Sequence, residues 1–428
     1  MITVLYGINP LTRTYLDTCG DQNTPIFAST DGGNEYEGQK VLSLAELCDV
    51  PREQIDKIVI CSMQVSEITG SLLRSGFDIF LLHFYDIRTN EVCRCSDYVN
   101  QSISEDDVLY AFYDLSCFAV GFDAIIFCSI ANILREELNK KYIHFIIVPN
   151  VSGQNGYVSV QNMFQKSDVE WRLDHLLQPL FRSVENAVGV TQLAVREEAH
   201  CYLRTGTDAF PKGYSPESRD WHMGWGDLKE HADRGVSLSC IKAPEQACDL
   251  VDNYLEDRSQ GRKAVVITLR ESRVQVERNS NIEAWGGFLR ELDTTNFFPI
   301  IVRDTYACTQ RLPECLEPFD DFPAASMDPS VRIALHQRAY INLCTSTGPG
   351  AIPFFMSGVS SIVFMPQIEN NPLTAKEVYE GFMGGQSRAP FFKDNENQWM
   401  AWCNETAENI TLHFNEMVDQ LERTGAQS

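Results

Sequence analysis

Short runs of β-branched and aromatic residues recur along this chain of 428 residues, and most are followed by a segment with helical periodicity. Strands that alternate with helices pair in parallel, because each helix returns the chain to the end of the sheet where the previous strand began. The alternation occupies residues 1–95, begins again near residue 105, and resumes at residue 262. The pattern predicts an α/β fold built from mostly parallel sheets.

The length of the chain adds a prediction about domains, since one hydrophobic core seldom extends over so many residues. We expect a small Rossmann-like domain at residues 1–97 and a second Rossmann-like domain at residues 105–240. A third Rossmann-like domain is expected at residues 241–428, where the sequence ends in an amphipathic helix.

The first expected domain has only part of a dinucleotide-binding loop. Gly7 follows the opening strand, but the further glycines that let a backbone approach a pyrophosphate are missing. Asp31 nevertheless stands at a suitable distance along the chain to meet a ribose. We therefore favour a structural or partner-docking role for this domain over dinucleotide binding.

The charge of the chain restricts its partners. A formal net charge of -24 argues against non-specific binding to nucleic acid or to anionic lipid, because both need a basic surface. An anionic ligand would need a local basic cluster. Six of the 35 Lys and Arg residues lie between Arg258 and Arg278, where an even distribution would place about two. That window is the best candidate for an anion site.

The start of the sequence, "MITVLYGINP", lacks the basic and apolar segments of a secretion signal. The longest apolar region, residues 108–134, contains Asp114 and Asp123 and is expected to be a strand and a helix instead of a membrane span. We therefore expect a cytoplasmic protein with reduced cysteines and no transmembrane segment. Cys93 and Cys95 lack a second pair at zinc-site spacing, so no metal site is expected.

Polar residues follow the strands expected in residues 241–428. The strand in "RKAVVITLRES" ends near Arg270, and the strand in "FFPIIVRDT" ends near Asp304. The strand "YINLCTS" ends at Ser346, and a Thr-Gly-Pro-Gly turn and a helix are expected after it. Ligands of open parallel sheets bind over the carboxyl ends of the strands, so we expect these residues to lie together.

This edge of the sheet suits a diphosphate. Guanidinium groups bind phosphate oxygens in bidentate fashion, and free N–H groups at a turn or a helix start add partial positive charge. Asn279, Ser280 and Asn281 are also placed to cap the helix "IEAWGGFLREL". The expected donor-binding residues are Arg270, Arg278, Asn279, Ser280, Asp304, Ser346, Thr347, Gly348, Pro349 and Gly350.

A different interpretation of the basic window stays open. Arg273 and Arg278 stand close in sequence to Glu271 and Glu277. Ion pairs between them would make the segment an ordinary solvated loop.

The order of these motifs resembles a known family. "ITLRE", "RNSNIEAW", "IIVRDT" and "STGPG" look like the carboxyl-terminal half of bacterial GT-B glycosyltransferases, and the last is similar to the Asp-Thr-Gly-Pro turn of lipopolysaccharide heptosyltransferases. "YDLSCFAVGFDAIIFCSIANILREEL" and "AFPKGYSP" resemble the other half of the same enzymes. Ser346 stands where the heptosyltransferase turn has Asp, so the donor nucleotide is not carried over. In the first expected domain, "VLSLAELCDVPREQIDKIVICSMQVSEITGSLLRSGF" resembles the small Rossmann-like domains attached to nucleotide-sugar-modifying enzymes and sugar transferases.

The resemblance implies a GT-B-like pair of Rossmann-type domains preceded by a small Rossmann-like domain. It implies transfer of a sugar from a nucleotide-sugar donor, with the leaving diphosphate stabilised by basic side chains and backbone amides, without a metal or a cofactor. The acceptor would be a carbohydrate, a lipid-linked molecule or a protein. A homo-oligomer is compatible with the sequence.

A carboxylate that takes the proton of the acceptor hydroxyl is expected in the amino-terminal half of the pair. Asp114 follows a strand, and Asp123 is an alternative that would also serve as a helix cap. Two other functions remain open. One is a nucleotide-sugar oxidoreductase or epimerase that uses residues 1–97, and the other is a non-catalytic scaffold that binds a nucleotide or a sugar.

Overall fold

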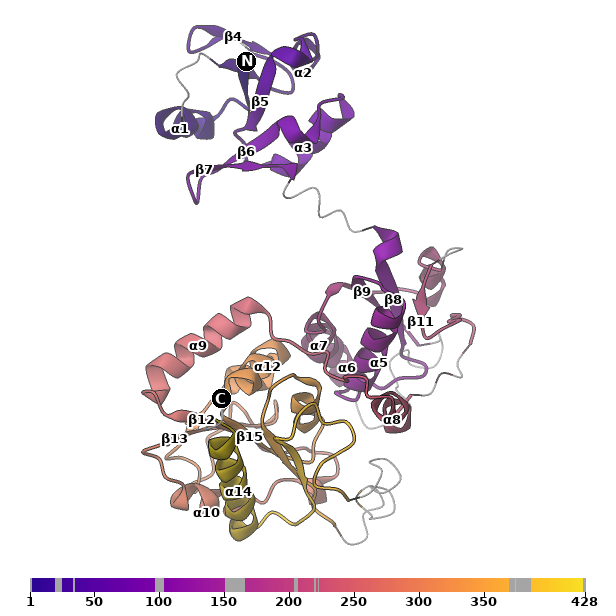
Figure 1. The fold of residues 1–428 in the computed structure, drawn as a ribbon, viewed down its shortest axis with the longest axis vertical. Coiled ribbons are helices and arrows are strands. Elements are labelled where there is room, and N and C mark those ends of the chain that lie inside the picture. Colours follow the sequence, from indigo (N-terminus) through magenta and orange to yellow (C-terminus); the bar gives the residue numbers. More distant parts are fainter. Residues whose placement is uncertain are drawn as a thin grey trace. The chain divides into compact units, whose positions relative to one another are not determined.

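The computed structural model describes residues 2–19, 25–33, 35–96, 104–150, 166–203, 207–218, 221, 223–368, 374 and 386–425. The chain forms two compact units, residues 1–104 and residues 105–428 (Figure 1). Both units contain parallel strands that are connected by helices.

The first unit is built on one sheet with the strand order β3-β4-β2-β1-β5-β6-β7. The β3–β4 and β6–β7 pairs at its two edges are antiparallel, and the pairs between them are parallel. The strands are β1 (Ile2–Tyr6), β2 (Ile26–Ala28), β3 (Glu35–Tyr36), β4 (Gln39–Leu42), β5 (Ile55–Ile60), β6 (Leu82–Asp86) and β7 (Glu91–Arg94). The helices are α1 (Pro10–Cys19), α2 (Leu44–Cys48) and α3 (Val65–Arg74).

The second unit begins with a parallel sheet in the order β10-β9-β8-β11. Its strands are β8 (Val108–Asp114), β9 (Tyr142–Val148), β10 (Ala187–Gln192) and β11 (Ala209–Phe210). The accompanying helices are α5 (Ala124–Glu137), α6 (Lys166–Arg172), α7 (Gln178–Arg182) and α8 (Trp225–Asp233), with a π-helical turn at Leu173–Leu177. A 3-10 helix covers Arg196–Cys201.

A further parallel sheet of the second unit has the order β14-β13-β12-β15-β16-β17. Its strands are β12 (Lys263–Thr268), β13 (Phe297–Val302), β14 (Asp320–Asp321), β15 (Ile341–Thr345), β16 (Ser361–Phe364) and β17 (Gln398–Ala401). The helices are α9 (Glu245–Ser259), α10 (Ile282–Glu291), α11 (Pro323–Met327), α12 (Pro329–Arg338) and α14 (Ala407–Gly425). One face of this sheet packs against α10 and α14, which contact each other.

The two sheets of the second unit share one hydrophobic core. A single cluster of buried side chains includes Phe127 of α5 and Phe354, which lies beyond β15. The backbone N–H groups of Cys240 and Ile241 both donate to the carbonyl oxygen of Phe355, at 3.0 Å. Residues on the two sides of position 240 are therefore packed together. The boundary predicted there stays a prediction.

The predicted α/β class is confirmed, and the succession of mostly parallel sheets is consistent with a GT-B-like pair of Rossmann-type domains after a smaller one.

One predicted helix differs from the expectation. The segment after the Thr-Gly-Pro-Gly turn, Pro349–Phe355, is a short 3-10 helix. Pro353 lies inside it and lacks the N–H group that an α-helix requires. Within the described ranges, every helix is too short or too polar to cross a bilayer.

Candidate functional site

Three neighbouring strands bring the predicted residues of the third sheet to one edge. β13 and β15 lie on either side of β12, and all three run parallel. Ser346 directly follows β15, and Arg270 and Asp304 each stand two residues beyond the carboxyl ends of β12 and β13. The loops are linked, because the Glu271 N–H donates to Asp304 Oδ2 at 2.8 Å. As expected, these residues lie at the same edge of the sheet.

The loop from Arg270 to Ser280 is closed on itself by hydrogen bonds. The Arg270 N–H donates to Ser280 Oγ at 2.8 Å, and the Ser280 N–H donates to the Arg270 carbonyl oxygen at 2.9 Å. The Asn279 amide bonds the backbone N–H and carbonyl of Ser272, each at 2.9 Å. Only Asn281 caps α10, by accepting from the Ala284 N–H at 3.3 Å. Asn279 and Ser280 thus fix the loop that carries the arginines.

Arg270 and Arg278 lie close to each other, and neither forms an ion pair at contact distance with a carboxylate of the described residues. The Arg270 side chain is half-buried, and its Nη2 donates to the Val274 carbonyl oxygen at 2.7 Å. Its Nε is buried and has no hydrogen-bond partner within the described part of the chain. Burial lowers the pKa of Arg270, and the positive charge of Arg278 lowers it further, whereas the carboxylates of Asp304 and Glu277 act in the opposite direction. Two neighbouring, half-buried cations favour a bound anion.

Arg278 reaches toward the turn after β15. Its Nη1 donates to Gln275 Oε1 at 2.8 Å, and its Nη2 donates to the Ser346 carbonyl oxygen at 3.3 Å. Among the described residues, neither Arg278 nor Arg270 has a carboxylate oxygen within 4.0 Å. Arg278 therefore connects the basic loop with the Thr-Gly-Pro-Gly turn.

The interpretation of the segment as an ion-paired loop fails for Glu271 and Arg273. Arg303 is 5% exposed, and its Nε donates to Glu271 Oε2 at 2.7 Å. Arg273 is exposed, with its guanidinium carbon 3.4 Å from the centre of the Tyr306 ring. Glu271 is therefore paired with the buried Arg303 and not with Arg273. Arg273 instead stacks on the Tyr306 ring.

The Thr-Gly-Pro-Gly turn packs closely against its surroundings. The Gly350 N–H donates to the Thr347 carbonyl oxygen at 3.0 Å, so this amide is already used within the turn. Gly348 has an ordinary helical φ of -52°. A Cβ at Gly348 would lie 2.9 Å from Phe122 Cβ, and a Cβ at Gly350 would lie 2.9 Å from the Thr345 carbonyl oxygen. Both positions lack room for a side chain. The neighbour of Gly348 is Phe122, which lies between β8 and α5 in the part of the unit built on the other sheet. Pro349 is buried beside them.

Asp123 comes to the same region from the start of α5. Its side chain forms no capping hydrogen bond with the helix, in contrast to the alternative cap role. The carboxylate is exposed to water, yet protein atoms around it displace enough hydration that desolvation raises its pKa above the usual 3.8. Arg278 acts in the opposite direction and lowers that pKa. Asp123 is thus an accessible carboxylate that interacts electrostatically with Arg278.

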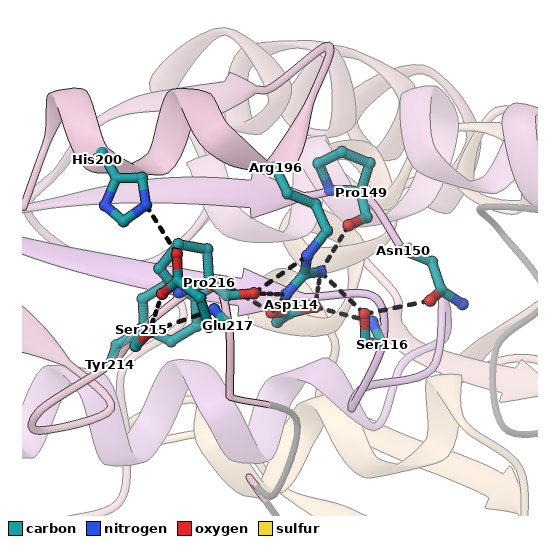
Figure 2. A network of polar contacts seen from close by, with 10 residues as sticks. All are labelled: Asp114, Ser116, Pro149, Asn150, Arg196, His200, Tyr214, Ser215, Pro216 and Glu217. Carbon is teal, nitrogen blue, oxygen red and sulfur yellow. Dashed lines mark hydrogen bonds and ion pairs between the residues drawn. The ribbon is translucent and has the colours of Figure 1, made fainter. Parts of the chain in front are cut away.

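Asp114, the other predicted base, lies in a different environment. It ends β8, is fully buried, and binds the Arg196 guanidinium through both of its oxygens (Figure 2). The Tyr214 hydroxyl and the Ser116 N–H also donate to it, at 2.8 and 2.9 Å. Its oxygens are therefore occupied by donors of the protein.

Sequence reasoning missed several residues near the predicted site. Arg196 and Tyr214 contact Asp114, and no local pattern distinguishes Arg196 from other arginines of the chain. Burial lowers the pKa of Arg172 of α6, while Asp168 and Asp304 raise it, so Arg172 lies near the end of β13. The structure draws attention to Arg172, because the π-helical turn that follows it is a feature common at functional sites.

The loop after β1 in the first unit is filled by its own side chains. Gly7 adopts a φ of +101°, and a Cβ there would lie 3.0 Å from the Cys61 carbonyl oxygen. The Asn9 amide donates to the same carbonyl at 2.5 Å, and its oxygen accepts from the Leu11 N–H at 2.8 Å. Asp31 forms a β-bridge with Ser43. The first N–H groups of α1 are thus bound within the loop.

Comparisons with known proteins add distant structural likenesses. No protein-family model and no curated protein sequence matches the chain. A glycosyl transferase family 9 protein from Veillonella parvula is similar at 12% identity over 70% of this chain and 87% of that chain, with a TM-score of 0.38. The E. coli ADP-heptose lipopolysaccharide heptosyltransferase II is similar at 8% identity over 74% and 99%, with a TM-score of 0.45. S. aureus MnaA, in a co-structure with UDP, is similar at 12% identity over 98% and 88%, with a TM-score of 0.26.

Proposed function

We propose that this protein is a GT-B-type glycosyltransferase, which transfers a sugar from a nucleotide-sugar donor to an acceptor hydroxyl. The observation that carries the proposal is the pair Arg270 and Arg278, half-buried beside each other and without an ion pair at contact distance to a carboxylate of the described residues. They lie over the carboxyl ends of parallel strands, where ligands of such sheets bind. Asp123, a carboxylate with a raised pKa, interacts electrostatically with Arg278.

The donor diphosphate would bind between the two guanidinium groups. Arg278 already contacts the carbonyl oxygen of Ser346, so a phosphate near Arg278 would also lie near the turn that contains Thr347 and Gly348. Charge builds up on the diphosphate as the bond between the sugar and its phosphate oxygen breaks. Fixed cations stabilise that charge, and this lowers the barrier without a required metal or cofactor.

Asp123 is the carboxylate that we assign as the base. In the reaction, the acceptor oxygen forms a bond with the anomeric carbon of the sugar, the nucleoside diphosphate leaves, and the hydroxyl proton passes to Asp123. A raised pKa makes a carboxylate a stronger proton acceptor. Asp114 is less suited to this step, because Arg196 and Tyr214 already occupy its oxygens. The acceptor would be a carbohydrate, a lipid-linked molecule or a protein.

Turnover of sugar nucleotides tests the proposal. We would incubate the protein with UDP-, ADP-, GDP- and CDP-glucose and measure the release of nucleoside diphosphate, with water as acceptor where no other is known. We expect release from at least one donor, and a loss on the order of a hundredfold or more in Asp123→Asn, with nucleotide affinity retained. Asp249→Asn, a change at an exposed aspartate of α9 in the second unit, is the matched control. Nucleotide binding with equal turnover in Asp123→Asn would contradict the base assignment.

A further inference from the structure

A buried ion pair connects the end of β8 to a segment far along the chain. Arg196 Nη1 donates to Asp114 Oδ1 and Nη2 donates to Asp114 Oδ2, both at 2.7 Å (Figure 2). Asp114 is 0% exposed and Arg196 is 9% exposed. The Tyr214 hydroxyl completes the group by donating to Asp114 Oδ2 at 2.8 Å. We call Arg196, Asp114 and Tyr214 the Arg196 clamp.

The guanidinium of the clamp is fully engaged. Nη1 also donates to Ser116 Oγ at 2.8 Å and to the Pro149 carbonyl oxygen at 2.7 Å. Nη2 and Nε both donate to the Pro216 carbonyl oxygen, at 2.6 and 3.2 Å. Figure 2 shows these acceptors arranged around the one guanidinium. The planar fork of an arginine can serve these acceptors when one hydrogen of Nη1 is shared between two of them, whereas a lysine ammonium has fewer N–H donors.

The clamp holds the connection between β8 and Asp123, which is residues 115–122. Ser116 in this connection is bound twice, by its N–H to Asp114 Oδ1 at 2.9 Å and by its hydroxyl oxygen to Arg196. The Tyr113 hydroxyl donates to the Ala119 carbonyl oxygen at 2.5 Å, farther along the same connection. The connection that leads to Asp123 is thus bound at Ser116 by Arg196 and at Ala119 by Tyr113.

We propose that Arg196 is a positioning residue, which acts through the connection 115–122 to place the carboxylate of Asp123. The inference rests on the proposed role of Asp123 as the base. Replacing a buried ion pair by apolar groups is often neutral for stability, so stability alone does not account for this pair. Its many directional bonds instead specify one geometry for the connection. A reacting group that is misplaced by about 1 Å can lose on the order of a hundredfold in rate.

The test compares two changes in the clamp with one control. Arg196→Lys keeps the positive charge but loses the fork. Tyr214→Phe removes one hydrogen bond and keeps the ring stacked on Phe112, where the ring centres are 4.5 Å apart. The second variant therefore decides the question if the first does not fold. Arg182→Lys is the matched control, because Arg182 is an exposed arginine of α7 in the same part of the unit.

The measurements are hydrogen exchange by peptide, the affinity for inorganic pyrophosphate, and kcat and KM on the sugar nucleotide that is turned over fastest. In Arg196→Lys we expect faster exchange in residues 115–122 and a fall in kcat on the order of a hundredfold. KM and pyrophosphate affinity should stay unchanged, because the arginines after β12 are not altered. Tyr214→Phe should show smaller changes in exchange and kcat in the same directions. Arg182→Lys should change neither quantity.

Unchanged exchange in residues 115–122 would overturn the inference, as would an unchanged kcat. Faster exchange throughout residues 105–428 would also overturn it, since that result describes general destabilisation. Failure of the proposed base would look different. Asp123→Asn would then keep its turnover, while the exchange of residues 115–122 would still show whether Arg196 holds this connection.

Discussion

At the residue scale, the proton affinity of Asp123 is set by two opposing influences. Desolvation raises the pKa of its carboxyl, and the positive charge of Arg278 lowers it. The proposed reaction needs the ionised form, so the rate should rise with pH as this carboxyl loses its proton. Arg278 would then act twice, by binding the diphosphate and by keeping Asp123 ionised.

The pH dependence of kcat tests this link. In the unchanged protein, kcat should rise through a pKa above 3.8, the usual value of an aspartate. In Arg278→Ala the same rise should occur at higher pH, because the charge that favours the ionised form is gone. Arg273→Ala, which removes the exposed arginine stacked on Tyr306, should leave the rise where it was. An unmoved profile in Arg278→Ala would show that the two groups do not interact.

At the element scale, a buried carboxylate accepts hydrogen bonds at the amino-terminal end of α10. Glu405 Oε2 accepts from the Asn281 N–H at 2.9 Å and from Trp285 Nε1 at 3.0 Å. Glu405 is 6% exposed, and burial raises its pKa above the usual 4.5. Asn281 directly follows Ser280, so this contact also supports the basic loop.

The raised pKa of Glu405 predicts how stability changes with pH. The folded state binds this proton more tightly than the unfolded state does. The resulting stabilisation is complete below pH 4.5 and is lost as pH rises through the raised pKa. In Glu405→Gln the free energy of unfolding should decline less over that range, as measured by urea denaturation at several pH values. Glu256→Gln, on the exposed face of α9, should decline like the unchanged protein. Parallel curves for all three proteins would contradict this account.

Elements were predictable from sequence where the information is local. The runs before Arg270, Asp304 and Ser346 predicted β12, β13 and β15, and the loops at their ends follow from parallel pairing. Long-range pairing was not predictable in this way. Arg196 and Asp114 are 82 residues apart, and hydrophobic periodicity carries no information about such a contact. The roles of the predicted site residues stay predictions.

At the scale of the whole molecule, the two units have separate hydrophobic cores. The clusters of the first unit are built from residues between Val4 and Cys95. The clusters of the second unit begin at Leu109. Each unit therefore buries its own apolar side chains, which is the requirement for independent folding.

Removing residues 1–104 tests the independence of the second unit. Residues 105–428 alone should unfold cooperatively and bind inorganic pyrophosphate as the full chain does, because Arg270, Arg278 and Asp123 all belong to this unit. Scanning calorimetry of both proteins shows whether unfolding is cooperative, and titration calorimetry gives the affinity for pyrophosphate. A product without a cooperative transition would show that the first unit is needed for folding of the second.

The central claim is that Arg270 and Arg278 bind a diphosphate. Titration of inorganic pyrophosphate and of UDP, ADP, GDP and CDP into Arg270→Ala, Arg278→Ala and Arg273→Ala tests it most directly. Loss of a charged hydrogen bond to phosphate should weaken binding by about 1.5 to 3 kcal/mol, or roughly tenfold to a hundredfold, in the first two variants. Arg273→Ala should change it by about 0 to 1 kcal/mol. Small and equal effects in all three variants would contradict the account.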